Sequence, residues 1–259
     1  MPAMRALILA AGRGERMRPL TNDLPKPLLP AGGQPLIDYH IHALARAGIR
    51  ELVVNLSWQG EKLRDYLGDG RRYGVTFAFS EEGPEPLETG GGIHHALPLL
   101  GAGVFWVVNG DIACDYAFAQ RSLVPGTLAH LVLVPNPPHN PRGAFQLNGD
   151  RIAPGPPAGA DARTFAGISV LDPQLFAGAT PGRFPLAPLL RAAAERGAVT
   201  GEEYGGRWTD VGTPERLEAL DAELKALLQA LPLSDPASRR EAPRSPCQPG
   251  PRQSARPAP

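Results

Sequence analysis

The sequence predicts an α/β protein built on a doubly wound, mostly parallel mixed sheet. Short apolar runs that suit buried strands alternate with segments of helical periodicity along the 259 residues, and this βαβ rhythm is typical of such sheets. A glycine-rich loop follows the run at 5–10, and an acidic turn follows the run at 104–109. Because ligands bind at the carboxyl ends of parallel strands, both loops should face one crevice.

The expected elements of the first half follow from these runs in order. The run at 5–10 is short and apolar, as in a buried parallel strand. A helix closed by Gly48 is expected at 36–47, and its spacing puts on one face Leu36, His40, Ala43, Leu44 and Ala47. Further strands are expected at 51–55, 76–79, 104–109 and 128–134, with a short helix at 62–67.

Residues from about 142 to 206 have a different pattern. The turn signal Asn-Gly-Asp at 148–150 separates two short runs at 145–147 and 151–152, which predicts a β-hairpin. Another strand is expected at 164–170. We interpret this stretch as a smaller lobe with antiparallel strands.

The last expected helix starts at Thr213-Pro214, with threonine as the cap and proline in the first turn. Its buried side should carry Leu217, Leu220, Leu224 and Leu227. The rest of the chain is rich in Pro, Ser, Arg and Ala and has too few apolar residues to offset the entropy of ordering. The sequence therefore predicts one domain over residues 1–230 and a disordered tail over 231–259.

Composition excludes several classes of partner. The formal net charge is zero, so no basic field points to nucleic acid or to an anionic membrane. No apolar run is long enough to cross a bilayer, and no signal-peptide pattern opens the sequence. Two distant cysteines, Cys114 and Cys247, do not make a disulfide framework. A reducing cytoplasm fits this cysteine content, and we expect a cytoplasmic monomer.

The glycine loop is the strongest chemical signal. Residues 9–30 read LAAGRGERMRPLTNDLPKPLLP, and Gly12 and Gly14 would let backbone N–H groups approach phosphate oxygens closely. The loop also carries the fixed cations Arg13, Arg16, Arg18 and Lys26. The loop is not a P-loop, because no Lys-Ser or Lys-Thr pair follows its glycines. It is not a dinucleotide fingerprint, because Met17 stands where the third glycine is needed. The loop predicts polyphosphate handling, and the alternative is a Gly/Arg surface turn.

Two acidic motifs stand far apart in the sequence. Asp111 lies in Asn-Gly-Asp after an apolar run, and Asp210 lies in Trp-Thr-Asp-Val-Gly before the last helix. Alone, each aspartate is more typical of a turn or a helix cap. Together with substrate phosphates, two carboxylates are the usual octahedral setting of Mg²⁺.

The pattern L-A-A-G-x-G-x-R-M-x-P-L-T followed by K-P-L resembles the sugar nucleotidyltransferase family, which joins a sugar 1-phosphate to a nucleoside triphosphate and releases pyrophosphate. The resemblance covers about residues 4–225. It implies a Rossmann-like nucleotidyltransferase fold, with the 142–206 lobe binding the sugar. It also implies Mg²⁺ held by Asp111 and Asp210, with Arg16 on the β and γ phosphates and Lys26 on the α-phosphate and the sugar phosphate.

The resemblance assigns the remaining site residues. Catalytic roles fall to Arg16, Lys26 and Asp111, and the sugar phosphate would be bound by Gly143, Ala144 and Asp210. The base site would be built by Glu82, Thr89 and Gly90. The full nucleotide-binding set is Leu9, Ala10, Ala11, Gly12, Arg13, Gly14, Glu15, Arg16, Lys26, Glu82, Thr89, Gly90 and Asn109. Glu202 and Glu203 are expected to be solvated rather than to reach the sugar.

The stretch P-L-E-T-G-G-G-I at 86–93 carries a narrower resemblance, to the N-acetylmuramate 1-phosphate uridylyltransferases of peptidoglycan recycling. The alternative is that Glu88 and Thr89 only cap a helix. The other motifs leave open mannose 1-phosphate with GTP, or glucose 1-phosphate with UTP or dTTP. A different class also stays open, namely a binding or regulatory subunit without turnover.

Overall fold

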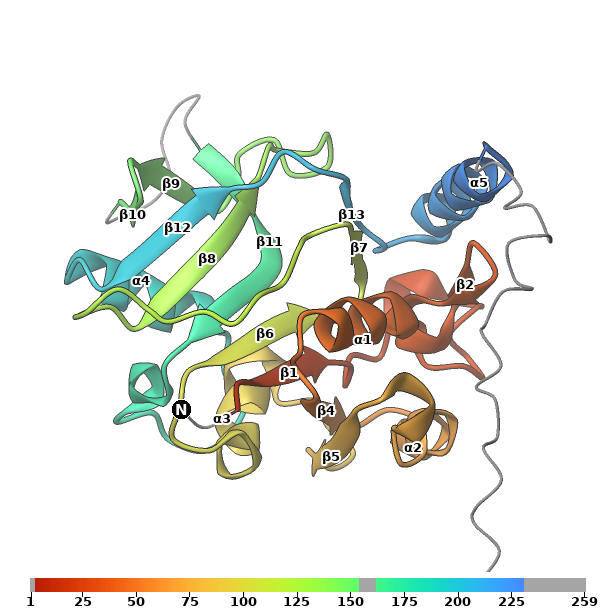
Figure 1. The fold of residues 1–259 in the computed structure, drawn as a ribbon, viewed down its shortest axis with the longest axis horizontal. Coiled ribbons are helices and arrows are strands. Elements are labelled where there is room, and N and C mark those ends of the chain that lie inside the picture. Colours follow the sequence, from red (N-terminus) through yellow and green to blue (C-terminus); the bar gives the residue numbers. More distant parts are fainter. Residues whose placement is uncertain (1–2, 154–161, 231–259) are drawn as a thin grey trace, which may run out of the picture.

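The computed structural model describes residues 3–153 and 162–230 (Figure 1). It is a mixed α/β fold around one nine-stranded sheet of order β5-β4-β1-β6-β11-β8-β12-β10-β9. The predicted fold class is confirmed. The predicted tail at 231–259, together with Cys247, lies outside the described residues. Within the described ranges, no helix is both long and apolar enough to cross a membrane.

The first half of the sheet is parallel. It consists of β1 (Arg5–Leu9), β4 (Glu51–Leu56), β5 (Thr76–Glu81) and β6 (Phe105–Asn109). The helices around it are α1 (Leu36–Arg46), α2 (Gly60–Leu67) and α3 (Glu88–Leu100). The four strands and the helices α1 and α2 match the predicted runs to within two residues at each end, whereas no bounds were predicted for α3.

The second half of the sheet is mixed. It consists of β8 (Ala129–Val134), β9 (Phe145–Asn148), β10 (Arg151–Ile152), β11 (Ala162–Leu171) and β12 (Val199–Glu203). β11 is antiparallel to both β6 and β8, and the predicted hairpin forms between β9 and β10. The strands of the 142–206 segment thus continue the same sheet.

The remaining elements are short pieces and two helices. They are the ribbons β2 (Pro30–Ala31) with β3 (Gln34–Pro35) and β7 (Ile112–Cys114) with β13 (Trp208–Asp210), the 3₁₀ turns η1 (Glu15–Met17), η2 (Lys26–Leu28), η3 (Arg71–Tyr73) and η5 (Pro173–Phe176), and the helices α4 (Ala187–Glu195) and α5 (Pro214–Ala230). In Figure 1 the β7–β13 ribbon and α5 lie beyond the ends of β1 and β6.

The strand order places a switch point beside β1. From β1 the chain builds outward to β4 and β5 on one side, and it returns to place β6 on the other side. Loops that leave β1 and β6 therefore diverge from a common edge. In open α/β sheets this is where ligands bind.

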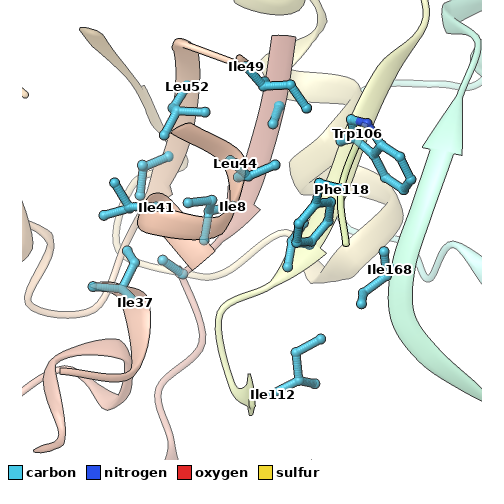
Figure 2. Close-up of a cluster of buried hydrophobic side chains, with 14 of the residues drawn as sticks. Ile8, Ile37, Ile41, Leu44, Ile49, Leu52, Trp106, Ile112, Phe118 and Ile168 are labelled. Atoms are coloured by element: carbon cyan, nitrogen blue, oxygen red, sulfur yellow. The ribbon is translucent and has the colours of Figure 1, made fainter. Parts of the chain in front are cut away.

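The sheet buries apolar side chains on both faces. Figure 2 shows Ile8 of the sheet among Ile37, Ile41 and Leu44 of α1, and Trp106 beside Phe118 in the same cluster. The alternate strand residues, among them Leu7, Val53 and Phe105, pack on the opposite face with Ile93 of α3 and Leu190 of α4. This alternation follows from the two-residue period of a strand, and it fixes the strand ends that carry the site.

Two predicted helix faces need correction. In α1 the fully buried apolar residues include Ile37 and Ile41, whereas Ala43 and Ala47 are only partly buried. The helix lies over the sheet and buries a wider arc than the predicted stripe. In α5, Leu217 and Leu220 are buried but Leu227 is 41 % exposed, so its predicted burial is wrong. The second half of α5 runs past the small core around Met17 and Val211.

Candidate active site

The glycine loop leaves the end of β1 and folds back on itself. Gly14 has a left-handed backbone (φ 62°), and a Cβ there would lie 2.9 Å from Cγ2 of Thr21. The Thr21 hydroxyl donates to the Gly14 carbonyl at 2.8 Å. Met17 is fully buried below the loop, while Gly12 and Arg16 are exposed. The loop is thus anchored from below and presents its backbone and cation outward.

Lys26 and Asp111 meet in the crevice. Lys26 Nζ donates to Asp111 Oδ2 at 2.7 Å, and the lysine side chain is 10 % exposed while the aspartate is 40 % exposed. Gly110, the residue before Asp111, lies where the ends of β6 and β1 approach closely. Its N–H donates to Leu9 O at 2.8 Å. A Cβ at Gly110 would stand 2.7 Å from that oxygen. The lysine is held by a carboxylate from a strand far along the chain.

The β7–β13 ribbon brings the second aspartate to the first. Asp210 lies opposite Ile112, and the next residue, Val211, donates its N–H to Asp111 O at 2.8 Å. The two predicted metal ligands therefore occupy adjacent backbones. His40 of α1 anchors this ribbon from behind, because its Nε2 donates to Ile112 O at 2.8 Å. Burial lowers the pKa of His40 to about 4, so the ring is neutral at pH 7.

Each aspartate already has a cationic or ring-nitrogen neighbour. Asp111 forms an ion pair with Lys26. Asp210 Oδ1 lies 2.5 Å from Arg216 Nη1 and 2.7 Å from His139 Nε2. Within residues 3–153 and 162–230 no cluster of three or more His, Cys, Asp or Glu residues could enclose a metal ion. Two carboxylates on neighbouring strands do fit a Mg²⁺ site, since that ion takes one or two protein carboxylates and completes its shell with substrate phosphates and water.

Two adjoining cavities form the crevice. The inner one, of about 210 Å³, is lined by the ends of β1, β4 and β6 and the start of α3. The outer one, of about 460 Å³, is lined by the glycine loop with Arg183 and Gly212. Together they are lined by twelve of the thirteen predicted nucleotide-binding residues, namely Leu9, Ala10, Ala11, Gly12, Arg13, Gly14, Glu15, Arg16, Lys26, Glu82, Thr89 and Asn109. Asp111 lines both.

The outer cavity is rich in guanidinium groups. Arg13 pairs with Glu85 at 2.7 Å, and Arg183 pairs with Glu88 at 2.9 Å. Arg16 makes no ion pair with any residue that the structure describes. An exposed guanidinium beside backbone N–H groups suits a polyphosphate, whose oxygens it can bind in pairs.

Gly90 is the predicted nucleotide residue that lies outside the linings. A Cβ at Gly90 would stand 2.6 Å from Cδ2 of Phe184, and one at Gly91 would stand 2.2 Å from Gly182 O. Gly91 also donates its N–H to Phe184 O at 3.0 Å. The structure therefore gives these glycines a packing function: they let α3 meet the 182–184 segment.

Gly143, predicted to bind the sugar phosphate, has no room for a side chain. Gly143 has φ 65°, and a Cβ there would lie 2.8 Å from Arg163 O; Ala144 donates its N–H to the same oxygen at 2.7 Å. Neither residue lines the two cavities. Gly167, at an irregularity of β11, lies directly against Asn109, since its Cβ would stand 2.8 Å from Asn109 Nδ2.

The expectation that Glu202 is solvated is wrong. The Tyr116 hydroxyl donates to its Oε1 at 2.5 Å, and Arg121 donates to both oxygens at 2.9 and 3.2 Å. Glu203 forms an ion pair with Arg163 at 2.9 Å. Both glutamates thus brace the end of β12 against neighbouring segments.

Sequence reasoning missed Asn55, Arg183 and Arg216. Asn55 is the next-to-last residue of β4 and Asn109 is the last of β6, so the rule that ligands lie at strand ends could have found it. Arg183 carries no local signal, because it reaches the crevice only through the packing of distant segments. Arg216 follows Asp210 by six residues along the chain and pairs with it.

The geometry is that of a nucleotidyltransferase, and the chain belongs to the nucleotidyl transferase family, whose sequence profile matches residues 5–123. The chain is 48 % identical over 225 residues to the N-acetylmuramate α-1-phosphate uridylyltransferase of Neisseria meningitidis serogroup B, a match that covers 85 % of this chain and 97 % of the relative. The enzyme of that name from Caulobacter vibrioides is 34 % identical over 232 residues, covering 85 % and 96 %.

Solved structures agree on the fold. A putative glucose-1-phosphate thymidylyltransferase from Bacillus anthracis, solved with sucrose, superposes with a TM-score of 0.76. It covers 86 % of this chain and 96 % of its own, at 22 % identity. At that identity the likeness concerns the fold alone.

Proposed function

We propose that this chain is an enzyme that transfers a uridylyl group from UTP to N-acetylmuramic acid α-1-phosphate, giving UDP-N-acetylmuramic acid and pyrophosphate. An oxygen of the sugar phosphate attacks the α-phosphorus, and the bond from that phosphorus to the bridging oxygen breaks. The electron pair leaves with pyrophosphate. Such a reaction asks the protein chiefly for positioning and for neutralisation of charge.

One observation carries the class of reaction. The glycine loop, Lys26 and Asp111 converge at the switch point of the sheet, and the ribbon that holds Asp210 adjoins the backbone of Asp111. Lys26 is nearly buried between the two strand ends, so its ammonium would hold a phosphate at the centre of the crevice. Arg16 and the backbone of residues 12–14 would bind the departing phosphates at the outer end.

Asp111 and Asp210 are the residues that would hold Mg²⁺. Their adjacent backbones and oxygen donors support this assignment. When bound, the ion neutralises negative charge on the reacting phosphates. In the structure Lys26 pairs with Asp111 and Arg216 pairs with Asp210, and Lys26 also lines both cavities.

The choice of substrates is supported by the relatives in Neisseria and Caulobacter, which match this chain over nearly their whole length. A place in peptidoglycan recycling and a cytoplasmic location belong to the same proposal. The remaining alternatives are GTP with mannose 1-phosphate, and UTP or dTTP with glucose 1-phosphate.

A substrate matrix tests the proposal. The purified chain is incubated with Mg²⁺, each of four nucleoside triphosphates and each of three sugar 1-phosphates, and pyrophosphate release is measured. Turnover should be highest for UTP with N-acetylmuramic acid α-1-phosphate, and it should disappear when EDTA is added. Another preferred pair would reassign the substrates. Nucleotide binding by calorimetry without turnover of any pair would instead indicate a binding subunit.

A further inference from the structure

Asn55 occupies the point where the sheet opens. The last register pair of β1 with β4 is Ile8 with Val54, whereas β4 goes on to pair with β5 through Asn55 and Ser80. Ala10 has therefore left the ladder, and its N–H donates instead to Asn55 Oδ1 at 2.5 Å. A backbone N–H can only donate, so this bond fixes which end of the amide faces Ala10.

The other end of the same amide reaches the opposite wall of the crevice. Asn55 Nδ2 donates to Glu82 Oε1 at 2.6 Å, and Glu82 Oε2 accepts from the N–H of Leu87 at 2.7 Å. Three hydrogen bonds thus connect Ala10, two residues before Gly12, to Leu87, two residues before Thr89. Asn55 is 3 % exposed and lines the inner cavity with Glu82 and Thr89.

Gly92 shows that α3 is built around this pair. A Cβ at Gly92 would stand 2.4 Å from Glu82 Oε1 and 3.1 Å from Asn55 Nδ2. The third glycine of the triplet therefore leaves room for the Asn55–Glu82 pair, whereas the first two admit the 182–184 segment. An independent feature of the helix thus supports the same contact.

We propose that Asn55 is a positioning residue that fixes the spacing between the phosphate loop and the start of α3. This inference rests on the proposed function, in which these two walls hold the triphosphate and the nucleoside of one molecule. A nucleotide binds both walls at once, so loosening the link weakens its binding in the reactive position. The sugar phosphate does not bridge these walls, so its binding is largely spared.

The first test is steady-state kinetics of Asn55→Ala. The KM for UTP should rise about tenfold or more, from the loss of two buried hydrogen bonds, while the KM for the sugar phosphate stays within about twofold. Ser80→Ala is the matched control, because Ser80 sits beside Asn55 on β5, is 3 % exposed, and its hydroxyl has no hydrogen-bond partner within the described residues. That control should keep both KM values.

A reciprocal exchange separates positioning from general packing. Asn55→Asp alone sets two carboxylates against each other and should weaken UTP binding more than the alanine variant does. In the double variant N55D/E82Q the glutamine amide can donate to the aspartate, while its oxygen still accepts from Leu87. This pair should recover UTP affinity at least tenfold relative to Asn55→Asp, with thermal melting recording the folded state of each variant.

The inference would be overturned by an unchanged KM for UTP in Asn55→Ala, or by equal increases in both KM values together with a melting temperature well below wild type. Failure of the double variant to improve on Asn55→Asp would also overturn it. If the wild type releases no pyrophosphate, the proposed reaction is wrong. UTP affinity measured by calorimetry on the same variants then decides the role of Asn55 by itself.

Discussion

The neutral, buried His40 predicts a specific loss of stability at mildly acidic pH. Its ring is packed under the β7–β13 ribbon, 1 % exposed, and donates to Ile112 O. Burial lowers its pKa from 6.5 to about 4. At pH values between these two, His40 binds a proton in the unfolded chain but not in the folded chain. The free energy of unfolding therefore falls as the pH falls below 6.5.

The magnitude follows from the two pKa values. At pH 7.5 the His40 penalty is close to zero, and at pH 5.5 it is about 1.4 kcal/mol, because the unfolded imidazole is then mostly protonated while the folded one is not. His40→Gln removes the titration and keeps an N–H donor for Ile112 O. Wild type should therefore lose about 1.3 kcal/mol more than this variant between the two pH values.

Urea denaturation at pH 7.5 and 5.5, followed by circular dichroism, measures the difference. Other groups titrate in both proteins, so their contributions cancel in the comparison. His95→Gln is the control, because His95 is exposed and bonds only to Glu81 O among the described residues; it should keep the wild-type pH dependence. If His40→Gln and wild type lose the same stability on acidification, the reasoning from burial is refuted.

The other predictions concern turnover and packing at the crevice. Lys26→Met should lower kcat by about 10²–10³ with a nearly unchanged melting temperature, because a preorganised charge on the reacting phosphates is lost; normal kcat would exclude Lys26 from the chemistry. Asp111→Ala should abolish metal-dependent turnover and keep the fold, as checked by pyrophosphate release and circular dichroism, and retained activity would contradict its role as a ligand. Gly110→Ala should destabilise by about 1–3 kcal/mol through overpacking against Leu9 O, measured by urea denaturation, and an unchanged midpoint would show that the strand ends can move apart.

Much of the fold was predictable because local signals and tertiary packing agree in the first half of the chain. The run before the glycine loop and the run before Asp111 are buried on both faces, so continuous apolar sequence marked them as parallel strands. The Asn-Gly-Asp hairpin followed from turn chemistry alone. The faces of α1 and α5 were harder, since burial depends on what lies beside a helix. Leu227 has the right spacing, but nothing described covers it.

The site residues also divide into those that local sequence motifs predicted and those whose partners lie far away in the sequence. Gly12, Lys26 and Asp111 stand in motifs whose spacing is fixed by a strand and a loop, so their convergence on one crevice could be anticipated. Glu202 was misjudged because its partners, Tyr116 and Arg121, come from a segment far away in the sequence. Pairing of this kind arises from sheet order, which one sequence does not specify locally.

The start of α3, which forms one wall of the crevice, contains three consecutive glycines and depends for its order on a segment far away in the sequence. Each glycine costs a helix about 1 kcal/mol relative to alanine, so the first turn of α3 is a poor helix in isolation. Its order depends on the backbone bonds that join Leu87 and Gly91 to Phe184. The amino-terminal half of this chain, expressed without residues 182–184, would therefore lack the backbone partners that order the start of α3.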